Sequence, residues 1–296
     1  MSNHNSQPQF STPNSGELGN IVLALREWQQ DGYVVQLHPG DLGWYGRYGS
    51  DATVKALRQW TREGELLAIG LLDGPEIARL AINPLAESDE RLTEQIAQDI
   101  TQANGQVPPF EPACIEARSS TLLRDKLLAR GWKVGEPWTS LRLDLAKPIE
   151  DSALRIEEVG PDLASVRTEL QRASFSNSSF TEKNWHNMAE SLPYTDSKCL
   201  IGYDKDDNAV ATVTVWSAGA EKPGLIEPLG VSQNYRHKGH GKAITLAAAI
   251  ALKEMGSSSV FVCTDSSNTG AVATYKSAGF EELPEVRDLE RACNTL

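Results

Sequence analysis

Residues 225–255 constrain the fold of this chain more than any other segment. The apolar run at 225–231 has the composition of a β-strand, a turn with glycines at 239 and 241 follows, and 242–255 favours a helix. The first amides of a helix have no intrahelical partner, and the helix dipole adds partial positive charge at that end. Glycines in the turn leave the backbone open to a close approach. This order of strand, turn and helix predicts an anion site, with a pyrophosphate as the expected ligand.

The turn has the sequence Arg236-His237-Lys238-Gly239-His240-Gly241-Lys242. It lacks the third glycine of the dinucleotide fingerprint, and the nucleotide P-loop would need a Ser or Thr where Ala243 stands. The spacing Arg-x-x-Gly-x-Gly resembles the acetyl-CoA loop of the GNAT superfamily of N-acetyltransferases. A second block follows at the distance typical of that superfamily, Asn268-x-x-Ala271-x-x-x-Tyr275-x-x-x-Gly279-Phe280. The resemblance covers residues 154–296.

The resemblance implies acetyl-CoA as the co-substrate. The residues it places against acetyl-CoA are Leu229, Gly230, Val231, Arg236, His237, Lys238, Gly239, His240, Gly241, Lys242 and Asn268. It also implies that the pantetheine arm pairs with backbone groups near Leu229 and Val231, in a slot between two parted strands. Pro228 lacks an N–H for the strand ladder, which suits a parted strand. Asn268 is placed to cap the next helix, to bind pantetheine, or both.

Tyr275 and Glu227 are the candidate catalytic residues. In relatives the tyrosine donates a proton to the departing sulfur, a role that suits a phenol as general acid; a packed aromatic side chain is the alternative. Strand periodicity predicts that Glu227, Leu229 and Val231 share one face. A carboxylate on that strand serves as general base or contacts the substrate ammonium, and the alternative is a rim acid without a part in the reaction.

Phe180, Trp185 and His186 are the candidates for contact with an acceptor amine, because residues 175–188 resemble the segment that covers the acceptor pocket in the superfamily. Packing between helices is the alternative for the aromatic side chains. His237 and His240 have a spacing that metal sites use, but the sequence offers no third ligand, so no metal is expected.

Composition limits the other functions. The 296 residues carry a net charge of −12, which disfavours nucleic acid or an anionic membrane as partner. The four cysteines form no Cys-x-x-Cys motif, and no apolar stretch reaches membrane-spanning length. The polar segment 1–16 is expected to be a disordered tail rather than a signal peptide. A cytoplasmic location is therefore expected, and the oligomeric state stays open.

The order of predicted elements occurs twice along the chain. We therefore predict an α/β protein with two tandem GNAT-like domains, 17–147 and 152–296, each a mixed, mostly antiparallel sheet flanked by helices. An unrelated α/β domain is the alternative for the first half. In that half we expect a helix at 52–62, a helix at 88–103 capped by Ser88, and the last strands at 132–145.

The first half is predicted to be a degenerate copy. The loop after Pro84 contains no glycine and is acidic, which favours a helix start but repels a pyrophosphate. Leu127 stands at the position that matches Tyr275. The aromatic residues of the first half leave open an acceptor or effector site there; they include Trp44, Tyr45, Tyr48 and Trp60.

The expected function is an acetyl-CoA-dependent N-acetyltransferase in which a small-molecule amine attacks the thioester directly. The two-domain plan with the active copy second also resembles mycothiol synthase. Two alternatives remain open, namely a protein N-terminal or lysine acetyltransferase and a non-catalytic acyl-CoA-binding regulatory module.

Overall fold

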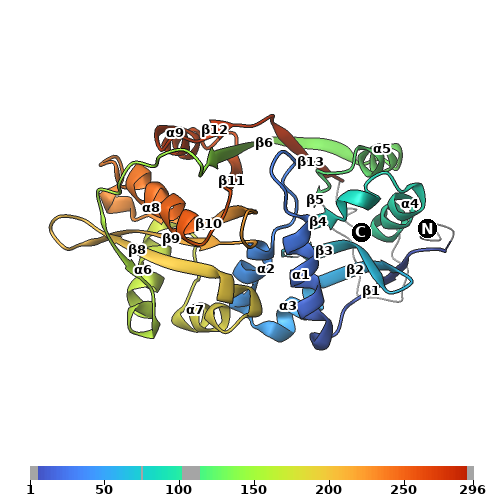
Figure 1. Cartoon of the computed structure of the whole chain (residues 1–296), viewed down its shortest axis with the longest axis horizontal. Helices are drawn as coiled ribbons and strands as arrows, with labels where there is room; N and C mark the ends of the chain where they lie inside the picture. Colours follow the sequence, from blue (N-terminus) through green and yellow to red (C-terminus); the bar gives the residue numbers. More distant parts are fainter. Residues whose placement is uncertain (1–5, 75, 102–113, 292–296) are drawn as a thin grey trace. The chain divides into compact units, whose positions relative to one another are not determined.

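The chain forms two compact units that do not follow its two halves. The computed structural model describes residues 6–74, 76–101 and 114–291 (Figure 1). The first unit comprises Met1–His38, Asp51–Pro137 and Val286–Leu296, and the second comprises Pro39–Ser50 and Trp138–Glu285. Compared with the predicted ranges 17–147 and 152–296, both units therefore contain segments from the other half of the sequence.

The first unit is built on a sheet with the strand order β1-β2-β3-β4-β5-β13. Its strands are β1 (Gln9–Ser11), β2 (Leu57–Arg62), β3 (Glu65–Leu72), β4 (Ile77–Ile82), β5 (Cys114–Glu116) and β13 (Val286–Glu290). Its helices are α1 (Leu18–Trp28), α3 (Ser50–Ala56), α4 (Glu90–Thr101) and α5 (Thr121–Ala129), with the short 3-10 helices η1 (Ser15–Glu17) and η3 (Pro84–Ala86). Apolar residues of α4 and α5 enclose a core around the fully buried Trp60.

The second unit repeats this plan with the strand order β7-β8-β9-β10-β11-β6, and β12 also pairs with β6. Its strands are β6 (Lys133–Asp144), β7 (Arg155–Glu158), β8 (Ser197–Tyr203), β9 (Ala209–Trp216), β10 (Pro223–Val231), β11 (Ser259–Asp265) and β12 (Glu281–Glu282). Its helices are α2 (Pro39–Tyr45), α6 (Ala164–Ser174), α7 (Glu182–Ala189), α8 (His240–Glu254) and α9 (Thr269–Ser277). Its short 3-10 helices are η2 (Gly46–Tyr48), η4 (Pro161–Leu163), η5 (Leu192–Asp196) and η6 (Gln233–Tyr235).

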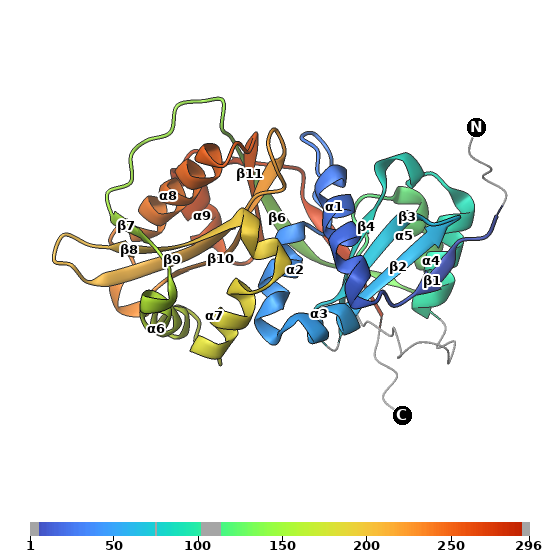
Figure 2. The same ribbon diagram turned by 60° about the horizontal axis from the view of Figure 1, so that its bottom comes forward.

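Helices cover both faces of the second sheet. Figures 1 and 2 show α8 on one face and α6 and α7 on the opposite face. Small alanine side chains let α8 lie close to the sheet and share its core. In each sheet one pair is parallel, β4 with β5 and β10 with β11, and the other described pairs are antiparallel. The predicted fold class, α/β with mixed, mostly antiparallel strand pairing flanked by helices, is confirmed.

Each unit contains a strand from the other half of the sequence. We expected 132–145 to complete the first sheet, but β6 pairs with β11 over seven residue pairs, from Asp144–Ser259 to Trp138–Asp265. The reason is burial, because Leu141 and Leu143 of β6 lie in the core of the second unit. At the other end of the chain, β13 pairs with β5 of the first unit.

Three local predictions were wrong. The helix expected at 52–62 ends at Ala56, because pairing with β3 draws the following residues into β2. Asp89 rather than Ser88 caps α4, since the Asp89 carboxylate accepts the amides of residues 91 and 92 at 3.0 and 2.9 Å. Gln9–Ser11, expected in a disordered tail, pairs with β2 as strand β1; residues 1–5 of that tail lie outside the described residues. Within the described ranges, no helix combines the length and apolarity needed to cross a bilayer.

Candidate active site

The start of α8 is an open, amide-lined corner of the second unit. Gly239 precedes the helix with a φ of 84°, a conformation that favours glycine. The first helical hydrogen bond runs from the Ala243 amide to the Gly239 carbonyl at 3.1 Å, so the amides before Ala243 have no intrahelical acceptor. A Cβ on Gly239 would meet no heavy atom within 4 Å. Free amides, open space and the helix dipole together suit a pyrophosphate.

The cations of this loop divide into two groups. The Arg236 guanidinium donates to the carbonyls of Ser174 and Val231 at 2.7 and 3.4 Å, so it fastens the loop to the ends of α6 and β10. Lys242 forms an ion pair with Glu150 at 2.6 Å. By contrast Lys238 is exposed, and its ammonium lies 5.1 Å from the centre of the Tyr235 ring. Lys238 is therefore the loop cation best placed to reach a phosphate.

His237 and His240 complete this loop. His237 is exposed and has a positive φ of 62°, and the half-buried His240 is the first residue of α8. Among the described residues, the structure contains no group of three His, Cys, Asp or Glu side chains suited to a metal ion.

Gly241 brings α8 against α9. A Cβ at Gly241 would lie 2.9 Å from the Cγ2 atom of Thr274. We expected this glycine to admit the phosphate, and the structure gives it a second role as the contact between two helices. Asn268 caps α9 by accepting the Ala271 amide at 3.2 Å, as predicted. The loop and the helix that carries Tyr275 are therefore held together.

Tyr275 lies in the core of the second unit with only 7% of its surface exposed. Its ring centre is 5.7 Å from that of Phe280. Burial raises the pKa of the Tyr275 phenol, because the charged phenolate would lose its hydration. The phenol is therefore held in its protonated form, the form that a general acid requires.

Strands β10 and β11 part in front of this loop. They pair in parallel at three positions only, ending at Leu225 with Phe261. Beyond that point β10 continues along β9 to Val231, and β11 continues along β6 to Asp265. Leu229, Gly230 and Val231 thus lie on the stretch of β10 that has left β11. The predicted parting of the two strands is confirmed.

Glu227 lies within an irregular stretch of β10. The register with β9 shifts between Ile226 and Leu229, where β10 carries one extra residue. Ile226 lies in the α8-side core and Leu229 and Val231 pack against it. Because a β-bulge interrupts the side-chain alternation, the shared face that we predicted for Glu227, Leu229 and Val231 does not follow from strand periodicity here.

The three predicted acceptor residues lie on or before α7. Phe180 and Trp185 are buried, and His186 is exposed. The Phe180 ring stacks on Trp44 with centres 5.6 Å apart and an angle of 11° between the planes. His186 lies edge-on to Trp185 at 5.0 Å. Phe180 and Trp185 are thus packed between elements, and only His186 is displayed at the surface.

The segment Pro39–Ser50 belongs to the second unit, although its sequence was predicted to be part of the first domain. Besides the Trp44 contact, the Arg47 carbonyl accepts from the amide groups of Asn184 and Asn187 at 3.0 and 3.1 Å. The segment therefore attaches to α7. The one signal for it in the sequence is Gly40-x-x-Gly43, two small residues at the spacing of a single helix face.

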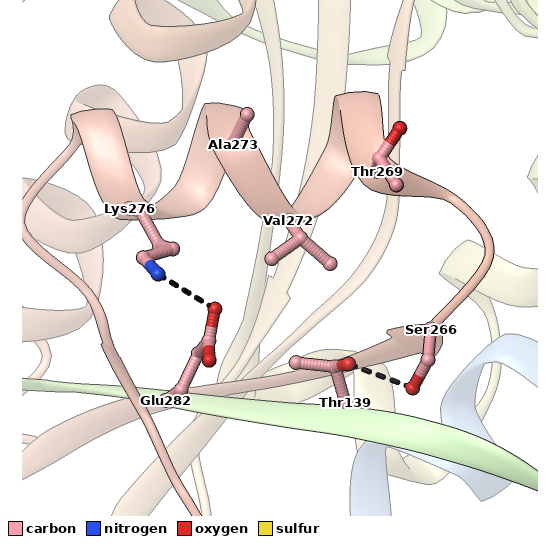
Figure 3. Close-up of a pocket in the computed structure, with 7 residues that line it drawn as sticks. All are labelled: Thr139, Ser266, Thr269, Val272, Ala273, Lys276 and Glu282. Carbon is pink, nitrogen blue, oxygen red and sulfur yellow. Dashed lines mark hydrogen bonds and ion pairs between the residues drawn. The ribbon is translucent and has the colours of Figure 1, made fainter.

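A pocket of roughly 570 Å³ lies beside α9 but contains none of the predicted site residues (Figure 3). It is lined by Thr139, Ser266, Thr269, Val272, Ala273, Lys276 and Glu282. Lys276 pairs with Glu282 at 2.8 Å, and the Thr139 and Ser266 hydroxyls are 2.8 Å apart. These polar groups satisfy one another, so the pocket is not the candidate site.

The first unit fills the corresponding helix start with its own carboxylate. The Asp89 carboxylate accepts hydrogen bonds from the first amides of α4. It also forms an ion pair with Arg62 at 2.5 Å. Burial alone would raise the pKa of Asp89, but the hydrogen bonds from Arg62 and the helix amides outweigh it and lower that pKa. The anion position that is open at Gly239 is therefore occupied by protein in the first unit.

Comparisons with known proteins agree with this geometry. Residues 164–280 match the family model described as "Acetyltransferase (GNAT) family". Over 63 residues the chain is 40% identical to a mycothiol acetyltransferase of Renibacterium salmoninarum, a match that covers 21% of this chain and 19% of that protein. The matched stretch thus spans about a fifth of that relative.

Solved structures share the fold over nearly the whole length of the chain. A GNAT-family acetyltransferase from Colwellia psychrerythraea has a TM-score of 0.63 at 12% identity, covering 95% of this chain and 98% of that one. A tandem GNAT protein from the clavulanic acid biosynthesis pathway has a TM-score of 0.56 at 12% identity, covering 96% and 98%. Residues 164–280 therefore match the GNAT acetyltransferase family, and this segment lies within the second unit.

Proposed function

We propose that the chain is an acetyl-CoA-dependent N-acetyltransferase that acts on a small-molecule amine. The observation that carries the proposal is the open start of α8 beside the parted strands β10 and β11. The corner suits a pyrophosphate, and the parted backbone edges suit an extended arm with amide groups. Together the two features fit the two ends of coenzyme A.

Glu227 and Tyr275 are the proposed proton carriers. When bound, acetyl-CoA supplies a thioester that a neutral amine attacks directly. The Glu227 carboxylate takes the proton that the amine loses as the C–N bond forms, directly or through a water molecule. The Tyr275 phenol gives a proton to the sulfur as the C–S bond breaks. Each group then returns to its starting state by proton exchange with solvent.

The small-molecule class is supported by the relative named mycothiol acetyltransferase and by the acidic surface. A net charge of −12 attracts cationic amines at low ionic strength. Protein N-termini and lysines are the competing acceptors, and binding without turnover would indicate a regulatory module instead.

Titration calorimetry with acetyl-CoA tests the proposed binding site. We expect one site per chain, lost in Gly239→Glu because the new carboxylate faces the phosphate position. Gly32→Glu is the matched control, since Gly32 is also exposed, has a φ of 86° and has no heavy atom within 4 Å of a Cβ. Two sites per chain would mean that the first unit also binds. No binding, or equal loss in both variants, would overturn the site.

Turnover is then measured as thiol release from acetyl-CoA with a panel of polyamines, aminosugars, amino acids and arylalkylamines. Release that depends on one class of amine supports the proposal and names the acceptor. A peptide panel with free N-termini or lysines tests the competing class. Binding without release from either panel would favour the regulatory module.

A further inference from the structure

Trp216 holds the backbone of the candidate general base. It is the last residue of β9 and is 1% exposed. Its indole Nε1–H donates to the Glu227 carbonyl at 2.6 Å. That carbonyl lies where β10 carries its extra residue and leaves the regular register with β9. The indole therefore bonds an acceptor at the bulge, where the ladder is interrupted.

Helix α2 fixes the indole in turn. A Cβ on Gly40 would lie 2.5 Å from the Trp216 Cγ atom, and a Cβ on Gly43 would lie 2.2 Å from its Cζ3 atom. Both distances are shorter than real carbon contacts, so α2 rests on the ring through two glycines of one helix face. Tyr194 meets the ring edge-on at 6.1 Å and 78°. The indole is thus confined by two elements besides its own strand.

We infer that Trp216 is a positioning residue for Glu227, and that α2 sets its position. The inference rests on the proposed function, in which Glu227 is the general base. The torsions that direct the Glu227 carbonyl belong to the backbone that carries its Cα–Cβ bond, so holding the oxygen fixes the direction in which the side chain leaves the strand. A base must lie within hydrogen-bond reach of its proton, and small displacements of such a group are costly.

A segment from the N-terminal half of the chain contacts Trp216. Its residues 39–50 belong to the second unit and contact Trp216 through Gly40 and Gly43. Within that unit α2 contacts Trp216, and Trp216 in turn contacts Glu227. The first half of the sequence thereby helps set the geometry of the site in the second.

The test compares Trp216→Phe with Trp60→Phe. Both indoles are buried and both donate one hydrogen bond, Trp60 to Asp99 at 2.9 Å in the first unit. With acetyl-CoA and the best amine of the panel, Trp216→Phe is expected to lower kcat by about 10- to 100-fold and to shift the acidic limb of the pH profile. Affinity for acetyl-CoA should be unchanged, which also reports a folded second unit. Trp60→Phe should alter neither kcat nor the profile.

A double-mutant cycle with Glu227→Gln separates this inference from the proposed function. If Trp216 acts through Glu227, adding Trp216→Phe to Glu227→Gln should cost little further activity. Full, additive losses, or an unaltered rate in Trp216→Phe, would overturn the positioning role alone. A wild-type rate in Glu227→Gln would overturn Glu227 as the base, and with it this inference.

Gly43→Ala supplies a second probe if Trp216→Phe fails to bind acetyl-CoA. It keeps the indole and its N–H but presses a methyl group on the ring, and we expect it to lower kcat without weakening acetyl-CoA binding. Gly19→Ala, in helix α1 with no heavy atom within 4 Å of the new Cβ, is its control. Equal rates for the two alanine variants would argue against control by α2.

Discussion

At the scale of single residues, Tyr275 is the proposed general acid. Because burial raises the pKa of its phenol, the acid form persists above the ordinary value of 10. We therefore expect Tyr275→Phe to lower kcat by about 100-fold while the acetyl-CoA dissociation constant stays the same. In the wild type, no loss of rate from this group is expected up to pH 10. Equal turnover in the variant, measured by thiol release, would remove Tyr275 from the mechanism.

Asp89 precedes a helix, as Gly239 does, but its carboxylate accepts the first helix amides. Its pKa is lowered in the folded chain from the ordinary 3.8, so its contribution to stability is present above that value and is lost as the pH falls through the folded pKa. Asp89→Ala should reduce the free energy of unfolding by about 1–2 kcal/mol at pH 7 and by less at pH 3. Asp89→Asn, which keeps a capping side chain, should lose less at pH 7. Urea unfolding at both pH values measures the difference; a pH-independent loss would contradict the assignment.

At the scale of elements, the contact between α8 and α9 links the binding loop to the helix of Tyr275. Gly241→Ala should weaken acetyl-CoA binding, because its Cβ collides with the Thr274 methyl group. Adding Thr274→Ser removes that methyl but keeps the hydroxyl that donates to Gly270. The double variant is therefore expected to regain most of the affinity in calorimetry. If the double variant binds as weakly as Gly241→Ala, the collision is not the cause.

The sequence predicts which helices and strands form better than it predicts which strands pair with one another. The turn at 236–242, the cap at Asn268 and the parting after Leu225 have local signals, namely glycines, a capping side chain and Pro228. The alternation of apolar and polar residues in β6 is compatible with either sheet, so the local sequence does not predict that this strand belongs to the second unit. The face of Glu227 depends on one extra residue in the register with β9, which is a property of two strands together.

At the scale of the whole molecule, the predicted catalytic range 152–296 is not a complete unit. It lacks β6, which pairs with all seven residues of β11, and it lacks α2. We expect this fragment alone to unfold or aggregate, because it would expose the β11 edge and the ring of Trp216. A fragment of residues 138–285 restores β6 and should be the more soluble of the two. Circular dichroism and gel filtration decide this, and a stable, monomeric 152–296 fragment would refute the expectation.

The exchange of β6 and β13 also makes the chain a candidate for a split protein. A cut in the joint near residue 147 yields two pieces, and each piece carries a strand that pairs with a strand of the other piece, β6 with β11 and β13 with β5. Neither piece closes its own core, so reassociation is the route by which both complete their backbone ladders. The two pieces of a chain divided there are therefore expected to bind each other. Restored acetyl-CoA binding would report that they have reassociated.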